Sequence, residues 1–242
     1  MAQNGAGRQG TVTVWRRLKR ALLLAPVAFL TLSIVLVVIY RFLPPPITPL
    51  MVIRLVEGED LDKDWVSYDQ VSPYVFKAVI AGEDARFCQH LGFDLEAIGK
   101  ALQHNKRSRH LRGASTITQQ TAKNLFLWPG RDPVRKVFEA YFAVLLELFW
   151  DKRRILEVYV NVVEFGHGIY GIEAAAQAYY KKSAKDLTAE EAARLAAILP
   201  SPLHRTPQRP GSADLPRIRA EMRNQPPPLS ERCPVGPYED ES

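Results

Sequence analysis

The sequence predicts an all-α domain behind a single N-terminal transmembrane helix, and three observations support this fold class. The chain of 242 residues contains one run of twenty uncharged, mostly apolar residues at 21–40. Helix start signals and apolar faces with helical spacing then recur between residues 70 and 205. Long alternating strand patterns and Asn-Gly hairpins are missing from that region, which argues against a β-rich fold.

Composition limits the class of protein before any motif is considered. Apolar residues make up 47% of the chain and charged residues 24%, as in a folded protein. The net charge of +6 comes entirely from residues 1–41, which hold six bases and no acid, so residues 42–242 are neutral. A nucleic-acid binder would carry its excess charge on the folded domain, and we therefore expect no nucleic-acid partner.

The apolar run has the properties of a retained membrane anchor. At ~1.5 Å per residue it spans about 30 Å, the thickness of the hydrocarbon core of a bilayer. Four basic residues stand directly before it, whereas acidic residues follow only from Glu57 on. The positive-inside rule then places residues 1–20 in the cytoplasm and the chain after Arg41 outside. A cleaved signal peptide is the alternative, but its apolar core is shorter and ends at small residues. We expect an anchor at 21–41.

The rest of the chain divides into three parts by composition. Residues 42–69 are rich in proline and then in acids, which favours an extended spacer. Residues 70–205 carry the helical signals and are expected to form the domain. Ten of the eighteen prolines lie in 200–242, so we expect residues 206–242 to be an irregular tail.

Helices are expected at six places in the domain. Ser72-Pro73 is an N-cap with proline at the first helical position, and it opens an apolar helix over 73–82. The segment 134–150 is apolar almost all round, which predicts a central buried helix. The other expected helices are 116–127, 155–161, 173–180 and 192–199, the last opened by a capping box from Thr188 to Glu191.

A basic block lies in the middle of the chain, with eleven bases and four acids between residues 101 and 154. Within it, Thr116, Gln119, Gln120 and Lys123 share one face of the expected helix. The hydroxyl groups and N–H groups at the start of this helix, with Lys123 two turns on, suit a phosphate or a sugar. A polar helix face in contact with water is an equally good explanation.

A second charged group follows at the start of the apolar helix. Arg131 precedes it, and Arg135, Lys136 and Glu139 fall on one helical face. An ordinary ion pair of a helix would explain this spacing. The next turns are apolar, however, so we expect the group at the mouth of a buried helix, where desolvation strengthens electrostatic interactions.

Glu83 is the candidate for proton transfer. It directly follows the apolar helix, where the negative end of the helix dipole and an apolar wall would both raise its pKa. The alternative is that Glu83 and Asp84 are surface acids at a helix end. His90 is expected to be a hydrogen-bonded structural histidine. The sequence contains no His/Cys metal spacing, P-loop or glycine-rich dinucleotide loop.

Five motifs that are typical of one protein family occur in order along the chain. The similarity to that family covers about residues 60–210. They are E-D-x-x-F-x-x-H-x-G at 83–92, G-x-S-T-I-T-Q-Q-x-x-K-N at 113–124, R-K-x-x-E at 135–139, I-L-E-x-Y-x-N at 155–161 and F-G-x-G-x-x-G-I-x-A-A-A at 165–176. In these motifs the chain resembles the peptidoglycan glycosyltransferase family, the module also found in class A penicillin-binding proteins. An S-x-x-K transpeptidase motif is missing from the sequence. The resemblance is therefore to the monofunctional biosynthetic transglycosylases of Gram-negative bacteria.

The resemblance implies a lysozyme-like helical fold and a defined reaction. Such enzymes polymerise lipid II into β-1,4-linked glycan strands in cell-wall synthesis. The donor is the growing glycan on undecaprenyl diphosphate, the acceptor is lipid II, and the anomeric carbon is inverted. The resemblance also implies an enzyme anchored in the bacterial inner membrane, with its catalytic domain in the periplasm and contacts with the membrane.

The resemblance also assigns roles to individual residues. Glu83 matches the base that takes the proton of the acceptor's 4-hydroxyl. Glu139 matches a second glutamate that supports departure of the diphosphate, either directly or through a divalent cation such as Mg²⁺ or Mn²⁺. The positions near the leaving group are Lys123, Arg131, Arg135 and Lys136, and the positions lining the cleft are Ser115, Gln119 and Gln120. A diphosphate leaving group needs clustered cations, which a hydrolase of neutral sugar chains does not.

Two other functions remain open from the residues alone. One is a lysozyme-like lytic transglycosylase or muramidase that uses Glu83 as an acid to cut existing glycan. The other is a non-catalytic scaffold that recruits other cell-wall synthesis or division proteins. Cys88 and Cys233 could form a disulfide outside the cytoplasm, but the geometry required is demanding and we expect free thiols.

Overall fold

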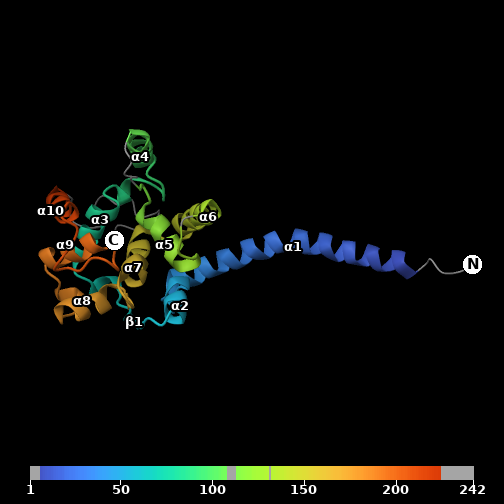
Figure 1. Cartoon of the computed structure of the whole chain (residues 1–242), viewed down its shortest axis with the longest axis horizontal. Helices are drawn as coiled ribbons and strands as arrows, with labels where there is room; N and C mark the ends of the chain where they lie inside the picture. The colour runs from blue at the N-terminus through green and yellow to red at the C-terminus, as the bar shows by residue number, and fades with distance from the viewer. Residues whose placement is uncertain (1–5, 108–112, 131, 225–242) are drawn as a thin grey trace, which may run out of the picture. The chain divides into compact units, whose positions relative to one another are not determined.

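The computed structural model describes residues 6–107, 113–130 and 132–224 (Figure 1). The chain divides into two compact units, Met1–Phe42 and Leu43–Ser242. The first unit holds one helix, α1 (Ala6–Phe42). Its part from Leu22 to Phe42 is long and apolar enough to cross a membrane. This helix fits the expected single-pass anchor at 21–41.

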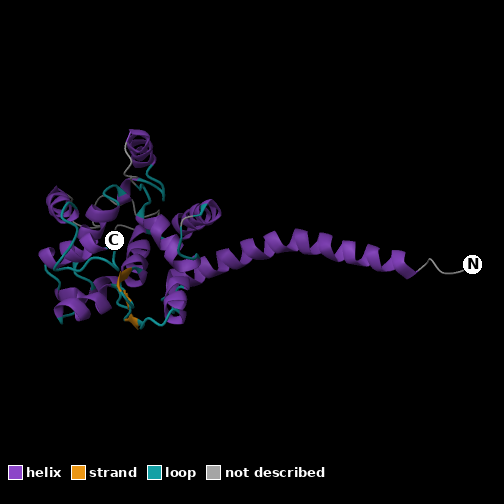
Figure 2. Cartoon of the chain, viewed as in Figure 1, coloured by secondary structure: helices purple, strands orange, loops and turns teal. Residues whose placement is uncertain are grey.

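The second unit is mostly helical, as Figure 2 shows, and the predicted all-α class is confirmed. Its helices are α2 (Pro49–Val56), α3 (Pro73–Glu83), α4 (Leu95–Arg107), α5 (Ile117–Phe126), α6 (Pro133–Phe149), α7 (Lys152–Val162), α8 (Ile172–Tyr180), α9 (Ala189–Ile198) and α10 (Asp214–Asn224). The six expected helices correspond to α3 and α5–α9, and their ends agree within a few residues. The capping box predicted at Thr188 and Glu191 is present at the start of α9.

Two groups of helices form the core. Helices α3, α9 and α10 pack together, and α5 packs against both α6 and α7 (Figure 1). The expected apolar face of α3 is buried, with Val75 and Phe76 each 1% exposed. The expectation of a central buried helix is correct for only one face of α6. Its face around Leu146 lies in the core, but Val137 and Leu148 on the opposite face are exposed, because α5 covers only one side of the helix.

A small three-stranded sheet joins distant parts of the chain. Its strands are β1 (Asp62–Lys63), β2 (Glu164–Gly166) and β3 (Ile169–Tyr170), in the order β1-β3-β2. Strand β1 is parallel to β3, whereas β2 is antiparallel to it. Gly168 lies in the β2–β3 turn with φ +69°, and a Cβ there would lie 2.4 Å from the carbonyl oxygen of Asp60. The turn therefore requires glycine.

The segment expected to be an extended spacer and the segment expected to be an irregular tail both contain helices. The spacer at 42–69 contains α2, whose first turn is capped by the Thr48 hydroxyl, which accepts from Met51 N–H. The tail contains α10, which packs on α3 and α9 and buries Ile218. Pro216 lies in the first turn of α10, where the N–H that it lacks has no helical partner in any case. The prediction of an irregular tail is therefore wrong for residues 214–224.

Cys88 is disulfide-bonded in the structure, so the expectation of a free thiol is wrong for this residue. Disulfide formation depends on the distance between two Cβ atoms in the fold, which spacing along the chain does not determine. Cys233 lies outside the described residues.

Candidate active site

Glu83 is the last residue of α3, and its side chain lies against α5. Its Oε2 accepts a hydrogen bond of 2.8 Å from Nε2 of Gln120. The amide oxygen of Gln120 in turn accepts from the hydroxyl of Tyr159 on α7, at 3.1 Å. Gln120 is thus fixed at both ends, and its orientation relative to Glu83 is set by a third helix.

Burial raises the pKa of Glu83 above its ordinary value, as the sequence predicts. The hydrogen bond from Gln120 lowers this pKa, and so do the charges of Arg217 and Lys123, whereas Asp214 raises it. Burial has the largest effect. The carboxyl group is therefore poised closer to neutral pH than an exposed glutamate, which suits a group that exchanges protons.

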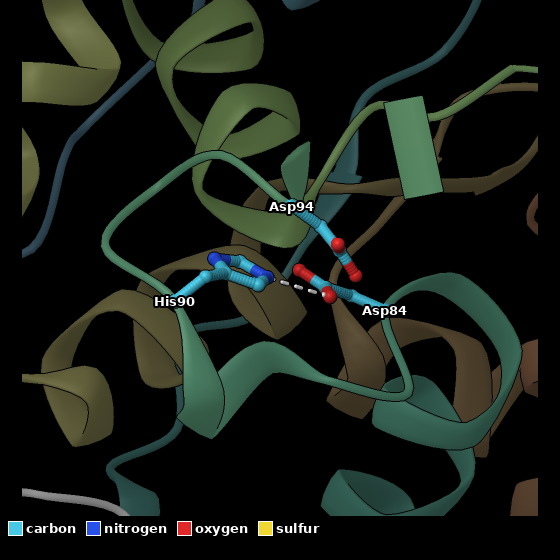
Figure 3. Close-up of side chains that lie close together, drawn as sticks. All are labelled: Asp84, His90 and Asp94. Carbon is cyan, nitrogen blue, oxygen red and sulfur yellow. Dashed lines mark hydrogen bonds and ion pairs between the residues drawn. The ribbon is translucent and has the colours of Figure 1, made fainter. Parts of the chain in front are cut away.

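Three side chains converge just after Glu83, namely Asp84, His90 and Asp94 (Figure 3). Oδ1 of Asp84 lies 2.9 Å from Nε2 of His90, and Oδ2 accepts from the Ile117 N–H at 3.0 Å. Asp84 therefore ties this segment to the first turn of α5. His90 is a hydrogen-bonded structural residue, in agreement with the prediction.

The same three residues are the described group whose composition would suit a metal ion, with ligand atoms within 4.8 Å of one another. Three of the four carboxylate oxygens already have hydrogen-bond partners, however, and the fourth, Oδ2 of Asp94, lies 3.8 Å from Nε of Arg86. Both oxygens of Asp84 accept the bonds just given, and Oδ1 of Asp94 accepts from the backbone N–H of Ala97 at 2.9 Å. We therefore interpret the group as structural, because its carboxylates bind the backbone N–H groups of Ile117 and Ala97.

The start of α5 is closed by its own side chains. Oγ1 of Thr116 accepts from the Gln119 N–H, and the Gln119 side chain accepts from the Thr116 N–H. The Thr116 hydroxyl also donates to the carbonyl oxygen of Gly92, at 2.6 Å. Gln119, 4% exposed, belongs to this cap and lines neither cleft described below. The Ile117 and Gln119 N–H groups therefore already have protein acceptors, Oδ2 of Asp84 and Oγ1 of Thr116.

Glu139 lies on α6 between two cations. Its Oε2 accepts from Nη1 of Arg135 at 2.5 Å, and its Oε1 contacts Nζ of Lys136. Lys136 also donates to the hydroxyl oxygen of Ser115, at 3.0 Å. Arg135 and Glu139 are buried, whereas Lys136 is exposed. With one cation on each oxygen, Glu139 does not fit a divalent metal ion.

Lys123 belongs to the same charged group. Burial lowers the pKa of Lys123, the charge of Glu139 raises it, and those of Arg135 and Lys136 lower it. Three of the four predicted cations are therefore within electrostatic range of one another. The fourth, Arg131, lies outside the described residues.

Two clefts open at these residues. The larger, of about 760 Å³, is lined by Glu83, Ser115 and Gln120. The smaller, of about 290 Å³, is lined by Gln120 and Lys123. Gln120 and Pro200 line both, so the two clefts adjoin each other at these residues. The link from Lys136 to Ser115 connects the cations of α6 to the cleft of Glu83.

Several cations of the clefts were not predicted. The larger cleft is also lined by Arg86, Lys100 and Arg217, and the smaller by Arg54. Arg54 and Arg217 fall in the segments taken for spacer and tail. The only sequence signal among these residues is Arg86, which lies inside the first motif.

The basic block is divided between two places. Lys152, Arg153 and Arg154, at the start of α7, pair with Glu147, Asp69 and Glu157 and line neither cleft. Only part of the block's charge therefore reaches the clefts, because α6 separates the two groups of bases by its whole length.

Comparisons with known proteins give a consistent result. The family model described as Transglycosylase matches residues 51–224. The chain is 58% identical to a biosynthetic peptidoglycan transglycosylase of Caulobacter vibrioides, over 81% of this chain and 86% of the relative. It is 52% identical to the protein of the same name from Bdellovibrio bacteriovorus, over 78% of each chain, and 52% to that from Pseudomonas putida, over 83% and 86%. The matched range includes all of α10 and all of α2 except its first two residues.

Proposed function

The chain belongs to the transglycosylase family and is a peptidoglycan glycosyltransferase of cell-wall synthesis, and from this premise we propose that it polymerises lipid II. The donor in this proposal is the glycan on undecaprenyl diphosphate, and the acceptor is lipid II. The product is a β-1,4-linked glycan strand with the anomeric carbon inverted. The observation that carries the proposal is the cleft in which Glu83 and the cation-linked Ser115 lie together.

In the proposed reaction Glu83 is the base. Its carboxylate takes the proton of the acceptor's 4-hydroxyl, and the oxygen attacks the anomeric carbon of the donor from the face opposite the diphosphate. A base needs a pKa close enough to the working pH to accept a proton in the transition state. The raised pKa of Glu83 and the fixed position of Gln120 support this role.

The bond from the anomeric carbon to the diphosphate oxygen breaks as the new glycosidic bond forms. The leaving diphosphate gains negative charge, which Lys123, Arg135 and Lys136 would stabilise. Glu139 would hold the last two in place, since each bonds one of its oxygens. We propose no step through a metal ion, because Glu139 is already neutralised by two cations.

The proposal also includes a location. The apolar part of α1 would anchor the enzyme in the inner membrane with residues 1–20 in the cytoplasm. The catalytic unit would then lie in the periplasm, on the side where the lipid-linked substrate is polymerised. The lipid chain of the substrate also requires a site close to a bilayer.

The test is incubation of the purified full-length protein, in detergent or in vesicles, with labelled lipid II. We expect long polymer that a muramidase can digest, and no polymer from Glu83→Gln, a loss of about 10²–10⁴-fold. The matched control is Asp186→Asn, an exposed acid outside both clefts, which should polymerise normally. Fragments released from whole sacculi without any polymer would instead indicate a lytic enzyme, and near-normal turnover by Glu83→Gln would refute the base assignment.

A further inference from the structure

A buried ion pair outside both clefts has no role in the reaction described so far. Nζ of Lys152, the first residue of α7, lies 2.7 Å from Oε1 of Glu147 near the end of α6. The two side chains are only 5% and 8% exposed. Lys152 also donates to the carbonyl oxygen of His90 at 2.8 Å, and its ammonium group lies 4.4 Å from the centre of the Phe87 ring.

Glu147 makes the matching contacts on the other side. The same oxygen that binds Lys152 accepts from the hydroxyl of Thr118 in α5, at 2.6 Å. Its Cγ would lie 3.1 Å from a Cβ at Gly92, so the side chain packs directly beneath that glycine. The pair therefore contacts two separate pieces of the chain, the segment 84–92 and the first turn of α5.

These two pieces build the environment of Glu83. The segment 84–92 continues directly from it, and α5 carries Gln120, which hydrogen-bonds its carboxylate. Asp84 joins the two pieces from one side through the Ile117 N–H. The ion pair joins them from the other side, through His90 and Thr118.

Stability alone does not explain a charged pair at this place. Removing two charges from water is costly, and apolar residues of similar volume are often as stable or more stable in such positions. A charged pair differs from an apolar one in fixing directions, because each of its hydrogen bonds has a preferred length and angle.

We propose that Lys152 and Glu147 are positioning residues for glycosyl transfer, which hold the segment 84–92 and α5 at the separation that brings Gln120 to Glu83. The inference rests on the proposed function of Glu83 as the base. Neither residue contacts substrate in this proposal. Their effect is transmitted through the His90 carbonyl oxygen and the Thr118 hydroxyl.

The test compares full-length Lys152→Met with the double variant Lys152→Met/Glu147→Met. The single variant leaves a buried carboxylate without its cation, so we expect a clear fall in melting temperature. The double variant leaves no unpaired buried charge, so it should melt at a higher temperature than the single variant, yet lose about 10²-fold in kcat for lipid II with KM unchanged. The matched control is Arg153→Met/Asp69→Asn, which removes an exposed pair that also starts on α7 and should leave kcat unchanged.

A double-mutant cycle with Gln120→Leu checks the route of the effect. If the pair acts through Gln120, adding the double variant to Gln120→Leu should cause little further loss of kcat. An equal further loss, or a double variant with wild-type stability and wild-type kcat, would overturn the inference. If the double variant does not fold, Lys152→Arg replaces it. Arginine keeps the charge but cannot reproduce the compact geometry, so we expect a folded protein of reduced kcat, and wild-type kcat would count against the inference.

The two levels of the proposal fail in different ways. Turnover retained by Glu83→Gln overturns the base assignment, whereas turnover retained by the stable double variant overturns the positioning role alone.

Discussion

The side-chain amide of Gln120 donates a hydrogen bond of 2.8 Å to the carboxylate of Glu83, from one turn into a helix that begins with a buried cap. This bond opposes the effect of burial on the pKa of Glu83, since it favours the charged carboxylate. The pKa nevertheless lies above its ordinary value. In the proposed mechanism, the working pH range of the enzyme therefore depends on the neutral side chain of Gln120.

Gln120→Leu should move the acidic limb of the pH–rate profile to higher pH. The base is active only when unprotonated, so activity falls as the pH drops through its pKa, and loss of the hydrogen bond raises that pKa further. The measurement is kcat/KM for lipid II between acidic and neutral pH. Gln177→Leu, which removes an amide on α8, is the control and should leave the limb in place. If the acidic limb of Gln120→Leu stays at the wild-type pH or moves to lower pH, the assignment of Glu83 as the base is contradicted.

Lys123→Arg should extend activity to higher pH. Burial lowers the pKa of Lys123, so its charge is lost at a pH where an exposed lysine would still carry it. Arginine remains charged throughout, and the alkaline limb of the profile should shift upward or vanish. Lys123→Ala should cut activity severely at every pH. An alkaline limb that is the same in the wild type and in Lys123→Arg would remove Lys123 from the titration.

Replacing each of the two cations that bind Glu139 should affect the free energy of unfolding differently. Lys136 is exposed, so Lys136→Met should change the free energy of unfolding by only about 0–1 kcal/mol while cutting turnover. Arg135 is buried with Glu139, so Arg135→Met should cost about 3–5 kcal/mol, because the buried carboxylate loses the buried one of its two partners. Urea unfolding and lipid II turnover of the two variants supply both readouts. Equal stability losses would show that burial does not distinguish the two cations. Glu139→Gln should also reduce turnover severely.

The two capping boxes offer a matched pair of threonines. Thr188→Ala should cost about 1 kcal/mol and leave turnover unchanged, because the Thr188 side chain serves only its own helix. Thr116→Ala should cost more, about 2–4 kcal/mol, since it also leaves the carbonyl oxygen of Gly92 without its donor. Turnover should fall in Thr116→Ala as the segment 84–92 loosens. Thermal melts and the polymerisation assay test this, and identical behaviour of the two variants would refute it.

Start signals in the sequence predicted two of the helices, α3 and α9. Ser72-Pro73 marks α3 correctly, although the Ser72 hydroxyl donates to the Leu187 carbonyl oxygen instead of capping the helix. The same kind of signal is present at Thr48-Pro49, where the surrounding prolines obscured it. The strands contain two or three residues each, too few for an alternating pattern.

Contacts between side chains of one motif could be predicted from spacing, whereas contacts between distant elements could not. Glu139 and its two cations lie within one helix, so spacing alone brings them together. The pair of Lys152 and Glu147 crosses from one helix to the next, and its purpose depends on the positions of His90 and Thr118, which no local pattern reveals. Gln119 looked equivalent to Gln120 in sequence, yet one closes a cap and the other faces the cleft, because neighbours on a helix point in different directions.

The hydrogen bond at the start of α5 determines when the Ile117 amide can exchange its proton with solvent. Ends of helices usually fray, and their amide protons exchange with solvent without unfolding of the rest. The Ile117 amide is bonded to Asp84, 33 residues away, and both residues are buried. Its proton can therefore exchange only when distant parts of the domain separate. Deuterium uptake at Ile117 should consequently occur at the rate of global unfolding. Exchange at this one amide therefore measures how often the segment that carries Glu83 and Asp84 separates from α5.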